Sequence, residues 1–254
     1  MSATVAAQAS GKARRGTASR FFAAMGALLL LLVVLGFSQT FYLRAFFAVR
    51  PIAPLVWLHG FALTAWFMGL VLQSVLVSTR RLDIHRRIGW GFAILALAVV
   101  ATGVWITLGT VSALSATGFD ANTVQVLAPR IAWGNYSSVL TFALLVGAAI
   151  VSRKSPQAHK RLMLLASIAI ISPALARILR WPVFGPALND NFAMAAIGGV
   201  FVLAAVVAAY DLMTRRRLHP ATLAGVVTIV GVKLAAVLVV APSAIGRALV
   251  PGLT

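Results

Sequence analysis

The 254-residue sequence contains no cysteine and no glutamate, and its only acidic residues are four aspartates. Without cysteine there is no disulfide, no thiolate ligand for zinc or an iron–sulfur cluster, and no cysteine nucleophile. With only Asp83, Asp120, Asp190 and Asp211 to supply carboxylates, paired-carboxylate catalysis and di-iron chemistry are disfavoured. The sequence also lacks nucleotide-binding motifs, which disfavours ATP-driven transport by this chain alone.

Charged residues make up 10% of the chain and hydrophobic residues 61%, and the deficit of charge is almost entirely acidic, since there are 22 Lys and Arg but only four Asp. A soluble domain carries roughly a quarter charged residues. The net charge of +18 does not indicate nucleic acid, because nucleic-acid-binding proteins carry their basic residues on a polar, solvated face. Here the basic residues form short clusters between apolar runs of about twenty residues, which is the pattern of a membrane protein. The expected partner is therefore the lipid bilayer, and nucleic acid is not expected.

Seven apolar segments predict an all-α, polytopic membrane helix bundle. Their ranges are 21–43, 55–77, 88–111, 135–151, 162–178, 193–213 and 221–240. The fourth and fifth have about 17 residues each, the lower limit for crossing the hydrocarbon core. A loop over 112–134, with room for a short surface helix, is expected between the third and fourth segments.

The chain divides into three predicted parts. Residues 1–20 form a basic segment that we expect to be disordered, with an organellar transit peptide as the alternative. Residues 21–242 form the seven-helix transmembrane domain, and residues 243–254 a short C-terminal tail.

The distribution of Lys and Arg predicts the orientation. If the N-terminus is cytoplasmic, the inner side carries fifteen basic residues and the outer side six. Basic residues favour the cytoplasmic side of a membrane. We therefore predict a multi-pass protein of the bacterial inner membrane with a cytoplasmic N-terminus and a periplasmic C-terminus.

Two basic turns, residues 80–87 and 153–161, resemble each other. Each contains a basic pair, a short polar stretch, a histidine (His85 or His159) and a second basic pair. A shift of 74 residues aligns the two histidines, so duplication of a helical hairpin is one explanation. Repeats of this kind are known in membrane bundles.

The residues before each histidine predict where the helices begin. Asp83 is expected to cap the third span, and Ser155 followed by Pro156 the fifth. His85 and His159 then lie in the first turns of two neighbouring helices, at the cytoplasmic mouth of the bundle. Three interpretations stay open: interfacial histidines among headgroup-binding arginines, a ligand pair, or a site for a polar or anionic ligand. A metal ion without haem is disfavoured, because no carboxylate or thiolate set completes a coordination shell.

His59 is the histidine that lies clearly inside a span. At about 100° per residue, Trp66 and Gln73 share its face of the helix. Polar side chains in a membrane face the bundle interior. His59 is accordingly an axial haem ligand, a proton-relay or substrate contact, or an interhelical hydrogen-bonding group. Gln73 is either such a hydrogen-bonding group or a ligand contact, and Trp66 is a packing residue.

Three further cationic residues, in two parts of the chain, are candidates for binding an anionic ligand. Lys233 lies near the middle of the last span, where it would neutralise a haem propionate, a quinone or Asp211, or extend to the interface. Arg177 and Arg180 lie at the outer end of the fifth span. They either bind an anionic partner or extend to the interface.

A recurring pattern of motifs runs through about residues 55–180. It consists of His59-Gly60, Gln73, His85-Arg86-Arg87-Ile88-Gly89, and His159-Lys160-Arg161-Leu162-Met163 followed by Arg177. In this pattern the chain resembles a family of bacterial polytopic membrane proteins of unknown function. That family is distantly similar to b561-type membrane cytochromes and to small oxidase-assembly membrane proteins. The resemblance implies a four-helix core of spans two to five and a function linked to haem or quinone. A b561-type protein places two histidine pairs within four helices, whereas here only His59 is clearly inside a span.

The leading expectation is therefore an integral membrane protein of redox or haem-linked respiratory work, such as an accessory protein in electron transfer. The expected cofactor-binding residues are His59, His85, His159, Gln73, Arg177 and Lys233, with the three histidines as haem-iron ligands. One alternative is a non-catalytic membrane subunit or assembly factor with structural histidines, bound to other membrane subunits. The other is a small-molecule or lipid carrier that uses the His59–Gln73 face as its pathway.

Overall fold

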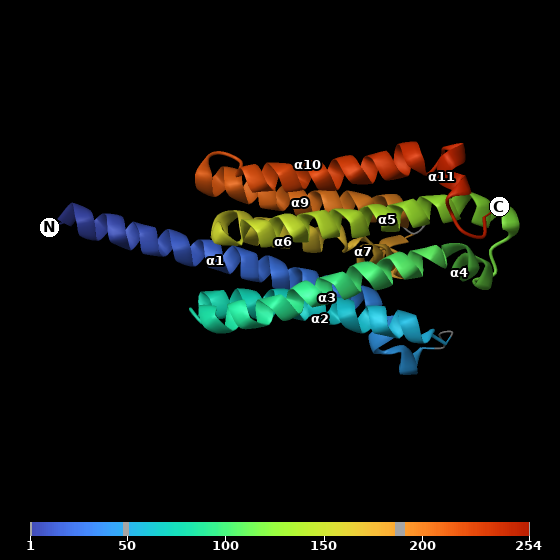
Figure 1. The fold of residues 1–254 in the computed structure, drawn as a ribbon, viewed down its shortest axis with the longest axis horizontal. Coiled ribbons are helices and arrows are strands. Elements are labelled where there is room, and N and C mark those ends of the chain that lie inside the picture. Colours follow the sequence, from blue (N-terminus) through green and yellow to red (C-terminus); the bar gives the residue numbers. More distant parts are fainter. Residues whose placement is uncertain (1, 48–50, 186–190, 254) are drawn as a thin grey trace.

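The computed structural model describes residues 2–47, 51–185 and 191–253. This part of the chain forms helices and turns and contains no strand, which confirms the all-α class. The long helices lie side by side in one elongated bundle (Figure 1).

Six helices are long and apolar enough to cross a bilayer. They are α1 (Ser2–Phe37), α2 (Pro54–Ser78), α3 (Leu82–Leu108), α5 (Ala121–Val151), α9 (Phe192–Arg215) and α10 (Pro220–Leu234), the last extended by the π-helix η5 (Ala235–Val240). A seventh crossing results if α6 (Pro156–Ala169) and α7 (Ser172–Ile178), which meet at a bend of 47°, count as one span. The predicted multi-pass bundle is confirmed, with its fifth span broken in two.

Shorter helices complete the described part of the chain. They are the π-helix η1 (Ser38–Tyr42), the 3-10 helices η2 (Arg44–Phe46), η3 (Ser152–Lys154) and η4 (Pro182–Phe184), and the helices α4 (Thr110–Ala116) and α11 (Ala244–Ala248).

The broken pair α6–α7 lies at the centre of the bundle. α6 packs on α1, α5, α9 and α10, and α7 packs on α1 and α9. Around this pair the outer helices contact one another in the order α1, α2, α3, α5, α10, α9. The ring of helices closes through Phe21 of α1 and Tyr210 of α9, whose stacked rings have centroids 3.8 Å apart. Because most residues of α6 are buried, this helix is enclosed on all sides.

A proline explains the break between α6 and α7. Pro173 lies in the first turn of α7, next to Ser172. Proline lacks a backbone N–H, and it disfavours the helical conformation of the residue before it. The central helix therefore stops at Ala169 and restarts in a new direction after Ile171.

The structure corrects the predicted boundary of the fourth span, which begins at Ala121 and not at residue 135. The expected loop over 112–134 is therefore largely helical. Asp120 caps α5, because its carboxylate accepts hydrogen bonds from the Thr123 backbone nitrogen at 3.0 Å and the Thr123 hydroxyl at 2.6 Å. These hydrogen bonds hold the pKa of Asp120 below its usual value. The polar composition of 121–134 resembled a loop, but this cap and continuous hydrogen bonding make it helical.

Both terminal segments also differ from the prediction. The backbone of residues 2–19 continues α1, where we expected disorder; alanine is frequent there and has the highest helix propensity. The predicted C-terminal tail folds back onto α5. Trp133 donates a hydrogen bond to the Gly246 carbonyl at 2.8 Å, and Val250 is 1% exposed.

The basic turns gather at one end of the bundle. The α2–α3, α5–α6 and α9–α10 connections all lie at the end that also holds the N-terminus (Figure 1). This end, which we call the basic end, carries the clusters in residues 80–87, 153–161 and 215–217. α4, α11 and the C-terminus lie at the opposite end (Figure 1).

Candidate functional site

His85 and His159 lie together at the basic end. Their ring centroids are 6.4 Å apart and their ring planes are at 89°. Each is the fourth residue of its helix, α3 or α6, so both lie in a first turn as predicted. Both side chains are half-buried.

One hydrogen bond determines the tautomer of the His159 ring. His159 Nδ1 is 2.9 Å from the carbonyl oxygen of Ala149, in the last turn of α5. A carbonyl oxygen only accepts, so Nδ1 carries the hydrogen, and in the neutral ring Nε2 keeps its lone pair. His85 Nδ1 is buried and has no hydrogen-bond partner within the described residues.

Gln73 of α2 adds an amide to this pair. Its Oε1 is buried and makes no hydrogen bond to any described residue. Its side chain lies against α3, since a Cβ added at Gly89 would be 3.8 Å from Gln73 Nε2, and the His85 ring lies next to the Gln73 backbone. We call His85, His159 and Gln73 the histidine site. Because unsatisfied buried polar atoms are rare, two of them in one site give the histidine site free hydrogen-bonding capacity for a polar ligand.

The predicted cap of α3 is wrong, and the predicted position of the α6 cap is confirmed. α3 is capped at Arg81 without a side-chain hydrogen bond, so Asp83 lies inside the first turn. There its carboxylate complements the helix dipole. Ser155 is at the N-cap of α6 with Pro156 following, as predicted, but its side chain makes no capping hydrogen bond.

His59 lies far from the histidine site. Its Nδ1 is 2.8 Å from the Thr102 hydroxyl of α3, which itself donates to the Ala98 carbonyl at 2.6 Å. Thr102 therefore accepts from His59 Nδ1–H. Along α2, His59 and Gln73 are about 21 Å apart, so His59 does not belong to the same site. Among the described residues no group of three or more His or Asp side chains is arranged to hold a metal ion.

Trp66 separates His59 from Gln73. It is 2% exposed, and its indole nitrogen donates to the Ser167 hydroxyl at 3.1 Å. The indole also packs edge-on against Phe142, with centroids 4.9 Å apart. The predicted packing role of Trp66 is confirmed.

Arg161 and Asp211 form a buried ion pair that the sequence did not predict. Their exposed fractions are 2% and 0%. Arg161 Nε donates to both carboxylate oxygens of Asp211, at 3.0 and 3.1 Å, and a terminal guanidinium nitrogen makes a closer contact. Asp211 also accepts from the Thr222 hydroxyl at 2.5 Å and the His219 backbone nitrogen at 3.1 Å. This network joins α6, α9 and α10.

His219 caps α10 beside this network. Its Nδ1 accepts a hydrogen bond from the Ala221 backbone nitrogen at 3.1 Å. Burial, followed by the charges of Arg161 and Arg215, lowers the pKa of His219. The ring therefore stays neutral near pH 7 and keeps the lone pair that the cap requires.

Lys233 is bound differently from the prediction. It is 3% exposed, and its ammonium donates to the Gly134 carbonyl and the Ser138 hydroxyl of α5, both at 2.6 Å. The predicted contact with Asp211 is wrong, because Asp211 lies near the basic end. Thirteen residues of α10 before Lys233 correspond to roughly 20 Å. Lys233 therefore ties α10 to α5.

Arg177 lies on α7, away from the histidine site. One terminal nitrogen donates to the Pro173 carbonyl at 3.0 Å, and the guanidinium lies 4.3 Å from the centroid of the Phe37 ring. Its Nε is buried without a hydrogen-bond partner in the described chain.

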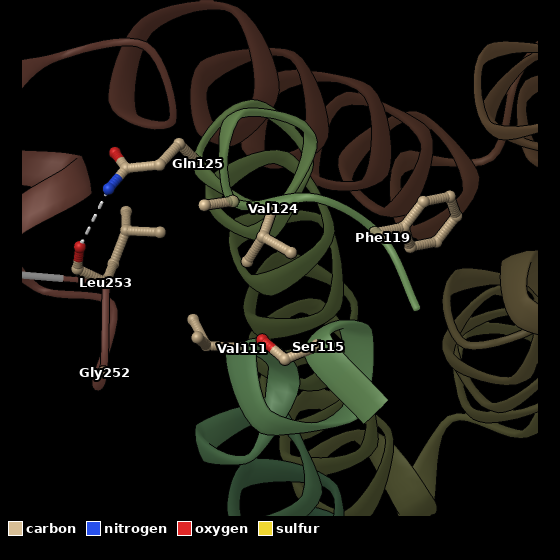
Figure 2. Close-up of a pocket in the computed structure, with 8 residues that line it drawn as sticks. Val111, Ser115, Phe119, Val124, Gln125, Gly252 and Leu253 are labelled. Carbon is tan, nitrogen blue, oxygen red and sulfur yellow. Dashed lines mark hydrogen bonds between the residues drawn. The ribbon is translucent and has the colours of Figure 1, made fainter. Parts of the chain in front are cut away.

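Two of the cavities among the described residues are lined by none of the predicted site residues. One, of about 360 Å³, lies at the opposite end, where Val111 and Ser115 face the start of α5 and the C-terminal segment (Figure 2). Gln125 closes one side by donating to the Leu253 carbonyl at 3.3 Å (Figure 2). The other, of about 510 Å³, is an apolar groove between α3, α5 and α10–η5.

The fold defines a multi-pass, all-α membrane helix bundle with an enclosed, broken central helix. Within it, the histidine site presents two imidazoles and one amide from three different helices. Comparison with protein-family models, with curated proteins and with solved structures found no match for this chain.

Proposed function

We propose that this chain is an integral membrane protein of haem-linked redox function, with His85 and His159 as the axial ligands of the haem iron. The observation that supports it is the 6.4 Å separation of the two ring centroids. A metal–nitrogen bond to histidine is about 2 Å long. If one metal ion lay between the two rings, the distance between the ring centroids would be the sum of two metal–nitrogen bonds and the two distances from ring nitrogen to ring centroid. That sum is close to the observed separation. The perpendicular ring planes are compatible, because each ring can turn about its own metal–nitrogen bond.

The hydrogen bonding of His159 suits a ligand. Metal-bound histidines usually donate their second ring N–H to a carbonyl or carboxylate, which fixes the tautomer and the ring orientation. His159 does this through Nδ1 and the Ala149 carbonyl, which leaves Nε2 for a metal.

The positive charge of the basic end is complementary to the negatively charged propionate groups of a haem. Arg86 and Arg87 directly follow His85 and are exposed, and Lys160 follows His159. These cations would pair with haem propionates. Two protein ligands would leave the iron no open position, so the proposed role is electron transfer, as an accessory protein to other membrane subunits.

Optical spectroscopy tests this proposal. Protein purified in detergent from cells supplied with haem should show a Soret band that shifts on dithionite reduction. His85→Ala and His159→Ala should each lose most of the bound haem, whereas His59→Ala, altered outside the site, should retain it. A colourless wild-type protein without iron would refute the proposal, as would full haem retention in both site variants.

Gln73 favours a second candidate, a hydroquinone held at the same site. Gln73 Oε1 and His85 Nδ1 are both buried and unsatisfied, and a hydroquinone has two hydroxyl donors to offer. In this case the protein is colourless but retains a quinone that organic extraction and chromatography detect. Gln73→Leu then removes the quinone, and quinone retention unchanged by that substitution contradicts this candidate.

A further inference from the structure

A second pair of unsatisfied buried atoms lies in the half of the bundle away from the basic end. They are Thr40 Oγ1, in the π-helix η1, and Arg177 Nε, in α7. Neither atom has a hydrogen-bond partner among the residues that the structure describes. Both atoms are donors that burial deprives of water, so each costs free energy unless a ligand satisfies it.

The contact between α1 and α7 lies close to both residues along the chain. Gly36 lies against α7 so closely that an added Cβ would be 2.5 Å from the Ala174 carbonyl oxygen. One residue later, Phe37 lies under the guanidinium of Arg177. Thr40, in η1, follows Gly36 by four residues, about one helical turn, so we expect its side chain on the side of the chain that faces α7, near Arg177.

Among the described residues, two arginines lie here without a carboxylate partner. Arg180, three residues after Arg177, lies over the Phe192 ring at 5.1 Å from its centroid. Within the described chain the one ion pair is Arg161–Asp211, so no described carboxylate neutralises Arg177 or Arg180. Of the five guanidinium donors of Arg177, Pro173 takes one.

The backbone is irregular on both sides of this pair. α1 changes to a π-helix at Ser38, and the central helix has restarted at Ser172. π-helical turns are frequent at functional sites. In a membrane, irregular backbone is tolerated where it is buried in protein or lines a cavity.

We propose that Thr40 and Arg177 bind a phosphate group, supplied by a phospholipid headgroup or as free phosphate. A tetrahedral oxyanion accepts several hydrogen bonds at once, and the guanidinium fork matches its geometry. The threonine hydroxyl supplies a further donor. Trp181, four residues after Arg177, marks the membrane interface, which is the depth of phospholipid phosphates.

Native mass spectrometry of the detergent-purified full chain tests the site. Dioleoyl phosphatidylglycerol is titrated against dioleoylglycerol, which has the same acyl chains and no phosphate; inorganic phosphate, followed by calorimetry, forms the second arm. Arg177→Gln should weaken binding at least about tenfold and Thr40→Val about fivefold, since each removes a hydrogen bond to a charged group. Arg130→Gln, which removes an exposed arginine of α5, should change nothing.

The outcomes separate the two sources of phosphate. Binding in the lipid arm alone assigns a headgroup, and binding in the phosphate arm alone assigns the free ion. Thr40→Val is nearly isosteric and keeps the test open if Arg177→Gln does not fold. The proposal is overturned if the wild type binds neither probe, if dioleoylglycerol binds equally well, or if Arg130→Gln weakens binding as much as Thr40→Val.

Discussion

Asp211 is the residue on which three helices depend. It is fully buried and takes hydrogen bonds from α6, from α10 and from the turn before α10. A buried ion pair gains little over a well-packed apolar pair, but removing one partner leaves a charge without compensation. The stability of the central helix is therefore sensitive to either member of the Arg161–Asp211 pair.

Asp211→Asn should destabilise the folded protein by about 3–5 kcal/mol, because it leaves the Arg161 charge buried and unpaired. Unfolding in mixed detergent, followed by circular dichroism, measures this. The double substitution Arg161→Met with Asp211→Leu should recover most of the loss, and Asp83→Asn, at an exposed position, should have little effect. Wild-type stability in Asp211→Asn would show that the pair does not hold α6.

Contacts between residues could be predicted only where a local sequence motif indicated them. The repeated turns predicted that His85 and His159 lie in the first turns of two helices and close together, and their ring centroids are 6.4 Å apart, although α6 packs mainly on α1, α5, α9 and α10. The Arg161–Asp211 pair joins residues 50 positions apart, and nothing in either local sequence specifies the other. Asp211 was one of several partners predicted for Lys233, and the contacts with Gly134 and Ser138 were missed, since helix periodicity gives the face of a helix but not which neighbour that face meets.

At the scale of the helices, α1 and α7 approach each other closely at Gly36. Gly36 permits it, because any side chain there would overlap the backbone of Ala174. Gly147 of α5 lies in open space, with no atom within 4 Å of an added Cβ among the described residues. The two glycines therefore offer a matched comparison within long helices.

Gly36→Ala should destabilise the protein by about 1–3 kcal/mol, because α1 and α7 must move apart. Gly147→Ala should instead stabilise it by about 0.5–1 kcal/mol through higher helix propensity. Thermal unfolding in detergent compares the two variants. Equal shifts of Tm in the same direction would contradict the close α1–α7 contact.

The helices themselves were largely predictable, because hydrophobic length is a strong signal in membranes. Two features were missed. The first turns of α5 carry polar residues and Pro129, which resemble a loop in sequence, and only the Asp120 cap reveals a helix start. Pro173 lies in an apolar run that is long enough for one straight helix. The hydrophobic length of this run therefore predicted a single span and not two helices.

The arrangement of the whole molecule separates two kinds of connection. The turns at the basic end are short and rich in arginine, and the opposite end holds α4, α11 and the C-terminus (Figure 1). Arginine-rich turns favour the cytoplasm, so a cytoplasmic basic end stays the predicted orientation.

Reporter fusions test this orientation. A fusion after Thr254 should report the periplasm, and one inserted at Arg216, in the turn before α10, should report the cytoplasm. These two positions are separated by one long helix, so reporters on the same side would refute α10 as a span. Opposite sides in the reverse order would refute the predicted orientation.

The enclosed position of α6 has a consequence for how the chain is made. Synthesis is N-terminal first, so α6 and Arg161 enter the membrane before α9 brings Asp211. Until then Arg161 has no carboxylate partner, and an unpaired arginine in a membrane has a substantial free-energy cost. A chain terminated after Trp181 would expose an unpaired arginine to membrane quality-control proteases.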